Sequence, residues 1–235
     1  MPVAGLILVK PSLAGNLGAA IRVAANFGVP RIELVEPGVD PDHPDVSAWA
    51  CGGNDRLVVA RHSSLEDAAA SYKTLIASAS GRGRDNQPLG TPREVLRYVA
   101  QRGTEGTALV FGNETRGLSR DDLDRCDLVV RIPTDPDFPV LNLTQTIAIL
   151  VGYISMELEP SPPTGPEPAA QELVSGLMTH LESSLAAIGF LDSENPQRML
   201  RKLRRLFGRA GITENEVSIL RGICRQMMWA ASRKQ

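Results

Sequence analysis

Long hydrophobic segments are missing from this sequence of 235 residues. No apolar run reaches the roughly 18–20 residues that a helix needs to cross a bilayer, so we expect no membrane span. The amino-terminal stretch has no basic residues before its first apolar segment, so we expect no signal peptide. With 43% hydrophobic and 22% charged residues, the composition is that of an ordinary globular protein. We therefore expect a cytoplasmic protein.

Cysteine and histidine are scarce, with three residues of each. Cys51, Cys126 and Cys224 lie far apart and form no C-x-x-C pair. We therefore expect reduced thiols in the core, as is usual for cytoplasmic proteins. The three histidines are equally scattered, so we expect no bound metal.

The nucleotide-binding glycine motifs are also missing. The segment GNLGAA (15–20) follows an apolar stretch and opens a helical pattern, but it lacks the G-x-G-x-x-G spacing. No acidic residue stands clearly about 20 positions further on, where a ribose-binding carboxylate is expected. A P-loop with its Lys-Ser/Thr pair is absent as well. These absences argue against a dinucleotide-dependent oxidoreductase and against a P-loop nucleotide hydrolase.

Short apolar segments alternate with helical patterns through the first two-thirds of the chain. Near-continuous apolar runs are typical of strands that are buried on both faces of a parallel sheet. This alternation predicts an α/β fold with a mainly parallel sheet. The strands are expected at 3–10, 31–37, 57–61, 74–80, 107–112 and 127–132, and helices at 16–28, 46–51, 64–72, 92–102, 119–122 and 142–157.

A proline-rich segment, EPSPPTGPEP (159–168), separates this α/β pattern from a purely helical one. Proline at nearly every second position prevents both helix and sheet, so the segment is predicted to be a linker. We therefore expect an α/β domain at 1–158, a linker at 159–169 and a small all-α domain at 170–235. Its helices are expected at 169–188, at 196–209 and after Thr213, which forms a T-x-x-E capping box with Glu216.

Charge is unevenly distributed between these parts. The net charge of the whole chain is −2, but the residues from Asn195 onward carry +8 and the rest of the chain carries −10. A basic segment on an acidic body indicates a polyanionic partner such as RNA. The alternative is that the basic helices are solvated or dock onto the acidic body, and composition alone leaves both open.

Polar, glycine-bearing segments follow two strands of the α/β domain. FGNETRGLS starts at Phe111, and PVLNLT (139–144) comes after the strand at 127–132. Ligands of α/β sheets bind outside the carboxyl ends of the strands. Together with N-x-G-x-x-x-R at 16–22, these segments resemble the three motifs of the SpoU branch of SPOUT RNA 2′-O-ribose methyltransferases. The basic tail from Arg198 resembles the carboxyl-terminal extension of the TrmJ-type tRNA methyltransferases within that family.

The resemblance implies a fold, a reaction and partners. It implies a SPOUT domain with a carboxyl-terminal trefoil knot, S-adenosylmethionine as cofactor, and a homodimer whose sites are each completed by the partner subunit. It also implies 2′-O-methylation of a pyrimidine ribose in the tRNA anticodon loop, typically at nucleotide 32. The alternatives are the same chemistry on ribosomal RNA, or an RNA-binding protein that has lost catalysis.

The resemblance also implies roles for particular residues. Arg22 would lie beside the target ribose, and because a guanidinium stays protonated at neutral pH we favour a phosphate anchor and stabiliser of alkoxide charge over a base. Asn16 and Asn142 would orient backbone or substrate, and Glu114 would hold the polar network. The cofactor would contact Ser78, Ala79, Ser80, Gly112, Ile132, Val140, Leu141 and Asn142. RNA would contact Arg22, Arg82, Arg84, Arg116, Arg201, Lys202, Arg204 and Arg205.

One position departs from the family pattern. The family usually has serine before Leu-Asn in the third motif, whereas this chain has Val140. A hydroxyl group that could contact cofactor or ribose is therefore missing. Ser78, Ser80 and Thr144 are the candidates to replace it.

Overall fold

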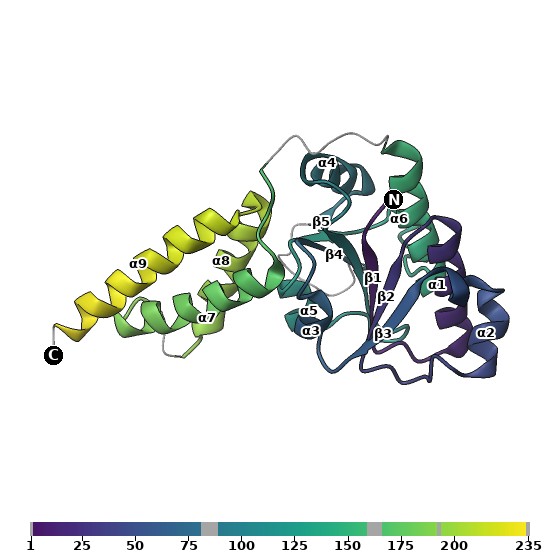
Figure 1. Ribbon diagram of the computed structural model, residues 1–235, viewed down its shortest axis with the longest axis horizontal. Coiled ribbons are helices and arrows are strands. Elements are labelled where there is room, and N and C mark those ends of the chain that lie inside the picture. Colours follow the sequence, from purple (N-terminus) through teal and green to yellow (C-terminus); the bar gives the residue numbers. More distant parts are fainter. Residues whose placement is uncertain (1, 81–88, 159–165, 192–193, 234–235) are drawn as a thin grey trace.

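The computed structural model describes residues 2–80, 89–158, 166–191 and 194–233. In this part of the chain, seven strands form one sheet in which every neighbouring pair is parallel, so the predicted α/β class is confirmed. The order is β3-β2-β1-β6-β4-β7-β5 (Figure 1). The strands are β1 Gly5–Val9, β2 Arg31–Val35, β3 Val58–His62, β4 Thr74–Ser78, β5 Leu89–Gly90, β6 Thr107–Phe111 and β7 Leu128–Val130. The trefoil knot stays a prediction.

Helices cover both faces of this sheet. Because side chains alternate along a strand, Leu6 and Leu8 of β1 join the core on one face, and Ile7 and Val9 join the core on the other. On the first face lie α1 Ala14–Asn26, α2 Pro44–Ala50, α4 Pro92–Arg102 and α6 Leu143–Glu157. On the second face lie α3 Leu65–Ala69 and α5 Arg120–Asp124. A short 3-10 helix at Gly53–Arg56 follows α2 and packs against α1 on the first face, since a Cβ at Gly53 would lie 3.2 Å from Ile21 Cγ2.

Most predicted element boundaries are confirmed to within a few residues. The capping box at Thr91 is present, since Thr91 Oγ1 accepts from the backbone N–H of Glu94 and the Glu94 carboxylate accepts from that of Thr91. β5 was not predicted, because a strand of two residues carries no periodicity. It exists only through its pairing with β7.

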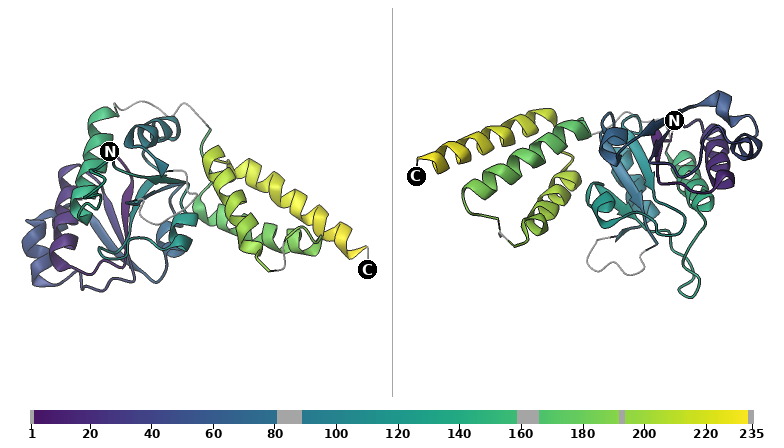
Figure 2. Two further views of the ribbon diagram at one scale, coloured as in Figure 1. Left: turned by 180° about the vertical axis from the view of Figure 1, so that it is seen from behind. Right: turned by 90° about the horizontal axis from the view of Figure 1, so that it is seen from below.

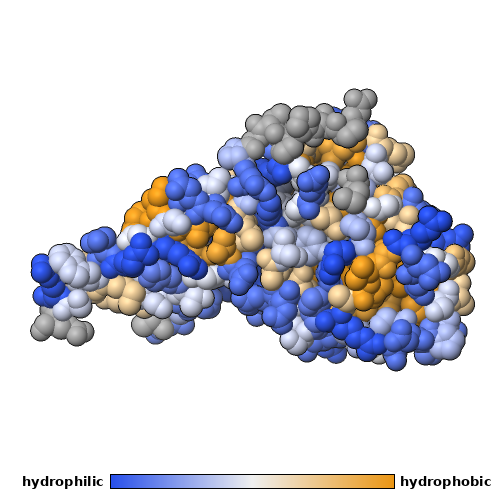
Figure 3. All heavy atoms as spheres, in the orientation of Figure 1, coloured by the Kyte–Doolittle hydropathy of each residue, from blue (hydrophilic) through white to orange (hydrophobic). Residues whose placement is uncertain are grey.

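The carboxyl-terminal helices pack around a core of their own. They are α7 Gln171–Ala187, α8 Pro196–Ala210 and α9 Glu214–Ser232. Leu177, Leu200, Val217 and Cys224 lie at the centre of this core. Figure 2 shows α9 projecting away from the sheet, and Figure 3 shows a hydrophobic patch among the hydrophilic side chains of these helices. The division into two domains and a linker stays a prediction, and residues 159–165 lie outside the described range.

The basic helix α8 faces the α/β body through ion pairs. Asp124 at the end of α5 is only 5% exposed, and its carboxylate lies 3.0 Å from Arg205 Nη2 and 3.4 Å from Arg201 Nε. A buried carboxylate requires such partners, because removing its charge from water is costly. For these two arginines the structure therefore supports docking onto the acidic body, the alternative that composition left open.

Hydrogen bonds from α4 complete the contact between the two parts. Tyr98 Oη donates to the carbonyl of Gly208 at 2.5 Å, and Arg102 Nη2 donates to that of Arg209 at 2.7 Å. The guanidinium of Arg102 also stacks over the Tyr98 ring, 3.8 Å from its centroid. The carboxyl-terminal helices are thus held through backbone carbonyls at the end of α8.

The cysteine prediction is only partly confirmed. Cys126 and Cys224 are buried, whereas Cys51 is exposed, so the expectation of a core thiol at Cys51 is wrong. Cys51 ends α2 in a left-handed conformation with φ 49°, which directs it out of the helix rather than into the core. In the described residues, no helix combines the length and apolar character that a membrane crossing requires.

Asp127 links stability to pH at the contact between the two parts. Burial raises the pKa of Asp127 to about 6, although its Oδ2 accepts hydrogen bonds from Leu75 N at 2.8 Å and Gln171 Nε2 at 3.0 Å. The native state therefore keeps a proton that the unfolded chain releases near pH 4. The stability contributed by this proton is present below about pH 4 and is lost as the pH rises through about 6.

We predict that Asp127→Asn removes this dependence. The amide oxygen of the introduced side chain can accept the same two hydrogen bonds but does not titrate. The free energy of unfolding of the variant, relative to that of the wild type, should therefore rise by about 1–2 kcal/mol when the pH is raised from 4.5 to 7.5. Urea unfolding at both pH values measures the difference between the two proteins. If the free energies of unfolding of the two proteins differed by the same amount at both pH values, Asp127 would not be the source of the pH dependence.

Candidate active site

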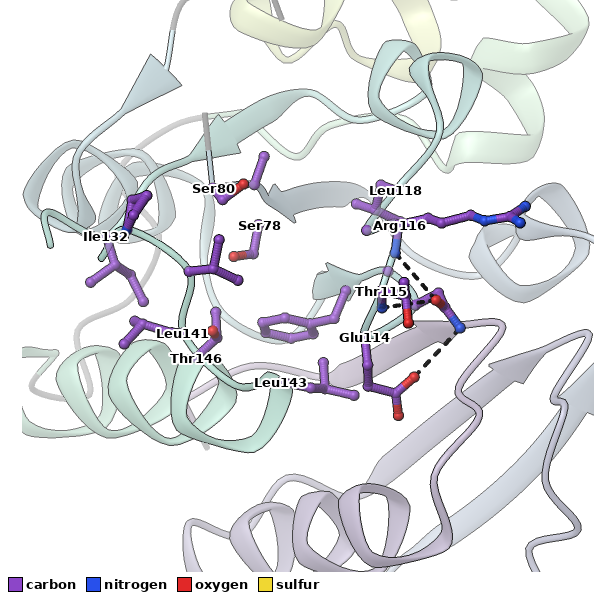
Figure 4. A pocket seen from close by; sticks show the side chains of 17 residues that line it. Ser78, Ser80, Glu114, Thr115, Arg116, Leu118, Ile132, Leu141, Leu143 and Thr146 are labelled. Carbon is purple, nitrogen blue, oxygen red and sulfur yellow. Dashed lines mark hydrogen bonds between the residues drawn. The ribbon is translucent and has the colours of Figure 1, made fainter. Parts of the chain in front are cut away.

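A cavity of about 370 Å³ opens at the carboxyl ends of β4, β6 and β7 (Figure 4). Its volume falls within the range of small-molecule sites. Four segments from different parts of the chain form its walls, because parallel strands deliver the loops that follow them to the same edge of the sheet. The lining residues are Ser78, Ala79, Ser80, Phe111, Gly112, Asn113, Glu114, Thr115, Arg116, Gly117, Leu118, Ile132, Pro139, Val140, Leu141, Leu143 and Thr146.

The structure brings together all but one of the residues expected to contact the cofactor. The exception is Asn142, whose neighbours Leu141 and Leu143 both line the cavity. Asn142 instead caps α6, where its Oδ1 accepts from the backbone N–H of Thr144 at 2.8 Å. The remaining seven are Ser78, Ala79, Ser80, Gly112, Ile132, Val140 and Leu141.

The cavity combines an apolar wall with hydroxyl groups. Figure 4 shows Ile132, Leu141 and Leu143 along one side, with Ser78 and Ser80 on the other. Such a lining suits a ligand that has both a flat apolar part and polar substituents. Thr144 was one candidate to replace the missing serine hydroxyl, but its Oγ1 donates to Asn142 Oδ1 at 2.6 Å and it does not line the cavity. Ser78 and Ser80 remain candidates for this hydroxyl group. Thr146 also lines the cavity, although it was not singled out from the sequence.

The loop after β6 forms one wall and is held in a tight turn. Asn113 Oδ1 accepts from the backbone N–H groups of Thr115 and Arg116, and its Nδ2 donates to the carbonyl of Lys10 at 2.8 Å. A Cβ at Gly112 would lie 2.1 Å from the backbone carbon of Gly117, so only glycine permits the turn to close. Asn113 was not singled out from the sequence, although it stands within the FGNE segment.

Glu114 ties this loop to the loop after β1. Its carboxylate accepts from Ser12 N at 3.1 Å, Ser12 Oγ at 2.8 Å and Leu13 N at 3.2 Å. Partial burial would raise the pKa of Glu114, but the hydrogen bonds from Ser12 and Asn16 outweigh burial, so its pKa is lowered. Glu114 therefore acts as an ionised acceptor here and not as a proton donor. The two backbone donors could not be identified from sequence motifs.

Two asparagines extend this network to the third motif. Asn16 Nδ2 donates to Glu114 Oε1 at 3.1 Å, and Asn142 Nδ2 donates to Asn16 Oδ1 at 3.2 Å. Asn16 stands 98 positions from Glu114 and 126 positions from Asn142 in the chain. The predicted polar residues of all three motifs, apart from Arg22, thus meet beside the cavity.

The glycine of the first motif has a packing role. A Cβ at Gly18 would lie 2.3 Å from the carbonyl oxygen of Val46, so α1 and α2 approach each other too closely for any other residue. Arg22 follows one turn later on α1, is exposed and does not line the cavity of its own chain. Its Nη1 donates to Cys51 Sγ at 3.3 Å.

The residues expected to contact RNA fall into three groups. Arg116 lines the cavity, and Figure 4 shows its side chain extending away from Ser78 and Ser80. Arg201 and Arg205 pair with Asp124, and burial lowers the pKa of Arg204, so these three face the body more than solvent. Lys202 is exposed. Arg82 and Arg84 lie outside the described residues.

Comparisons with known proteins agree over nearly the whole chain. The model of the SpoU rRNA Methylase family matches residues 4–152, and that of the tRNA methyltransferase TrmJ C-terminal domain matches residues 172–235. The chain is 35% identical to the tRNA (cytidine/uridine/adenosine-2′-O-)-methyltransferase TrmJ of Pseudomonas aeruginosa (strain UCBPP-PA14), over 93% of this chain and 91% of that one.

Solved structures show the same arrangement. The crystal structure of TrmJ from Z. mobilis ZM4 superposes with a TM-score of 0.81 at 27% identity, covering 96% of this chain and 99% of that one. The SpoU methyltransferase AviRb from Streptomyces viridochromogenes, in complex with the cofactor AdoMet, shares the fold with a TM-score of 0.54 at 22% identity. That likeness covers 66% of this chain and 60% of that one.

We predict that Glu114→Gln destabilises the site while leaving its shape nearly unchanged. An amide has one acceptor oxygen in place of two, so donors of the loop after β1 lose their acceptor. We expect this loss to lower the free energy of unfolding by about 1–3 kcal/mol. Because the pKa of Glu114 is lowered, its contribution is present above the ordinary pKa and is lost as the pH falls. The loss should be measurable by urea unfolding at pH 7.5 and should shrink below pH 4.

The exposed Glu105 provides the control. Glu105→Gln changes the same functional group outside the network, so its unfolding free energy should match the wild type at both pH values. Equal effects of the two substitutions would show that the Glu114 network adds nothing to stability.

Proposed function

The chain belongs to the SpoU rRNA Methylase family, and we propose that it transfers a methyl group from S-adenosylmethionine to a ribose 2′-hydroxyl in the anticodon loop of tRNA. Within the family, the match of residues 172–235 to the TrmJ carboxyl-terminal domain favours tRNA over ribosomal RNA. The observation that carries the proposal is the convergence of Asn16, Glu114 and Asn142 beside the cavity.

The cavity fits the cofactor by its chemistry. The apolar side chains of Ile132, Leu141 and Leu143 suit the adenine ring, and the hydroxyls of Ser78 and Ser80 suit the polar groups of the ribose and amino acid. Bound there, S-adenosylmethionine would supply an electrophilic methyl group on a sulfonium. Small residues after β4 allow backbone atoms to approach such a ligand closely.

The protein has to stabilise charge at the attacking oxygen. A ribose hydroxyl is a poor nucleophile until its proton is withdrawn, so a cation at that oxygen lowers the barrier. We assign this role to Arg22 in preference to that of a general base, because a guanidinium stays protonated at neutral pH. Asn16, Asn142 and Glu114 would hold the surrounding loops in place.

We further propose that the enzyme works as a homodimer. Arg22 does not line the cavity of its own chain, which accords with a site completed by the partner subunit. Helix α6 presents exposed Ile149 and Met156, which are suited to contact a second copy. Residues 1–158 would form the catalytic domain and 170–235 an RNA-binding domain joined by the linker 159–169, working in the cytoplasm.

The nucleotide is a finer proposal. By resemblance we assign the ribose of a pyrimidine at nucleotide 32. The name of the P. aeruginosa relative includes adenosine as well as cytidine and uridine. Tolerance for several bases indicates that such enzymes select position in the folded RNA more than base identity, which is usual when RNA is recognised by shape.

We predict methyl transfer from radiolabelled S-adenosylmethionine to bulk tRNA and none to ribosomal RNA. Nucleoside analysis should show a 2′-O-methylated pyrimidine, and primer extension at low nucleotide concentration should map it to nucleotide 32. Label in ribosomal RNA alone would overturn the substrate. Tight tRNA binding without transfer to either RNA would identify a binding protein that has lost catalysis.

We predict that Arg22→Ala lowers kcat at least about 100-fold, the usual cost of removing one donor to a developing oxyanion. Binding of S-adenosylmethionine by calorimetry should be unchanged, because the proposed cofactor contacts do not include Arg22. Arg56→Ala is the matched control, since this exposed arginine precedes β3 at the amino-terminal edge of the sheet, opposite the site. Wild-type kcat in Arg22→Ala would refute the assigned role.

A further inference from the structure

Trp49 is a large aromatic residue on the surface of α2, and 60% of it is exposed. It does not project freely, because it lies against the first-motif helix. A Cβ at Gly15 would lie 3.4 Å from the indole Nε1 and 3.6 Å from Cδ1 and Cε2. One side of the indole is therefore supported by α1, and much of the remainder is open to solvent.

The glycine of the first motif, Gly18, permits the close approach of this residue to α1. At Gly18 a Cβ would lie 2.7 Å from the Trp49 Cβ as well as 2.3 Å from the Val46 carbonyl oxygen. Glycine at position 18 therefore lets α2 place Trp49 directly on α1, whereas the distances at Gly15 are those of ordinary van der Waals contact. Figure 1 shows α1 and α2 side by side at the end of the molecule away from the carboxyl-terminal helices.

Arg22 lies on the same side of α1. Residues 15, 18 and 22 are spaced by three and four, which places them along one helix face. The hydrogen bond from Arg22 Nη1 to Cys51 Sγ confirms that its guanidinium reaches α2 two residues beyond Trp49. An exposed indole and an exposed guanidinium thus share one surface, which we call the Trp49 surface. It is made by Gly15, Arg22, Trp49 and Cys51 and lies over the buried Gly18.

This pair has the chemistry of a nucleotide-binding surface. Unpaired RNA bases stack on aromatic side chains, and stacking is worth about 1–3 kcal/mol per base. A guanidinium on the same surface can bind the ribose or phosphate of a nucleotide that stacks there. A protein partner without negative charge would leave Arg22 unpaired in the contact, and burying an unpaired charge is costly. The combination therefore favours a nucleotide.

We propose that Trp49 stacks on the base of the nucleotide whose ribose is methylated. This inference rests on the proposed function, because it assigns a base-binding residue to the same substrate. Stacking requires only a π face and reads no donors or acceptors. The Trp49 surface would therefore accept cytosine, uracil and adenine alike, and would hold the nucleotide unstacked from its loop while Arg22 acts at its ribose.

Fluorescence provides a direct test, since Trp49 and Trp229 are the two tryptophans of the chain. In a Trp229→Phe protein, Trp49 is the single indole, and base stacking should quench its emission when tRNA is added. In a Trp49→Phe protein, the emission of Trp229 reports separately on tRNA binding at the carboxyl-terminal helices. Quenching of Trp49 emission is expected, and unchanged Trp49 emission at saturating tRNA would overturn the inference.

Kinetics with an abasic substrate tests which base is stacked. Trp49→Ala should raise KM for an anticodon stem-loop about 5- to 100-fold, and Trp49→Phe should restore most of the loss. A stem-loop abasic at the methylated nucleotide keeps its 2′-hydroxyl and should impose a similar loss on the wild type. In Trp49→Ala the abasic substrate should cause little further loss, because both changes remove one interaction. Additive losses would overturn the inference.

Two controls separate this inference from the other proposals. Size-exclusion chromatography should show the same oligomeric state for Trp49→Ala and the wild type, and dissociation of the variant would make the Trp49 surface a contact between copies of this chain. If the wild type methylates tRNA and Trp49→Ala does so with wild-type KM, only the stacking inference fails. If the wild type methylates no tRNA, the proposed function itself fails.

Discussion

The site depends on one carboxylate. Glu114, on the loop after β6, accepts hydrogen bonds from the backbone and side chain of Ser12 and from Asn16, which belong to the loop after β1 and to α1. Through Asn16, the same network reaches Asn142 at the start of α6. Beside this network, the hydrogen bond from Asn113 Nδ2 to the Lys10 carbonyl also ties the loop after β6 to the loop after β1. Glu114 is the centre of the network because the donors to its ionised carboxylate belong to a loop and a helix distant from it in the chain.

Close packing at glycines makes this arrangement possible. Gly112 permits the loop after β6 to fold back on Gly117, and Gly18 permits α2 to lie against α1. In both places the neighbour is backbone, which cannot move aside as a flexible side chain could. The first contact shapes the cavity, and the second positions the surface that carries Trp49 and Arg22. The conformational freedom of glycine is used at only one of these positions, Gly117, whose φ is 66°.

The carboxyl-terminal helices show how charge can be misassigned from composition. The excess of arginine in α8 indicates a polyanionic partner, and part of it has another role. Arg201 and Arg205 neutralise the buried Asp124, while Lys202 remains exposed. Whether a cation faces the body or the solvent depends on which side of α8 the α/β domain covers. That is a property of the contact between two parts of the chain and not of either sequence segment.

The sequence by itself determined the class of fold, the order of the strands and helices, and the motifs of the site. It could do so because buried parallel strands, capping boxes such as Thr91–Glu94, and polar segments after strands are local patterns. Only the tertiary structure decided which donors satisfy Glu114, that Asn142 reaches Asn16 across 126 positions, that Thr146 and not Thr144 lines the cavity, and that Cys51 is exposed beside Arg22. These features arise where segments distant in the chain meet, and the geometry of such a meeting depends on packing that no local pattern contains.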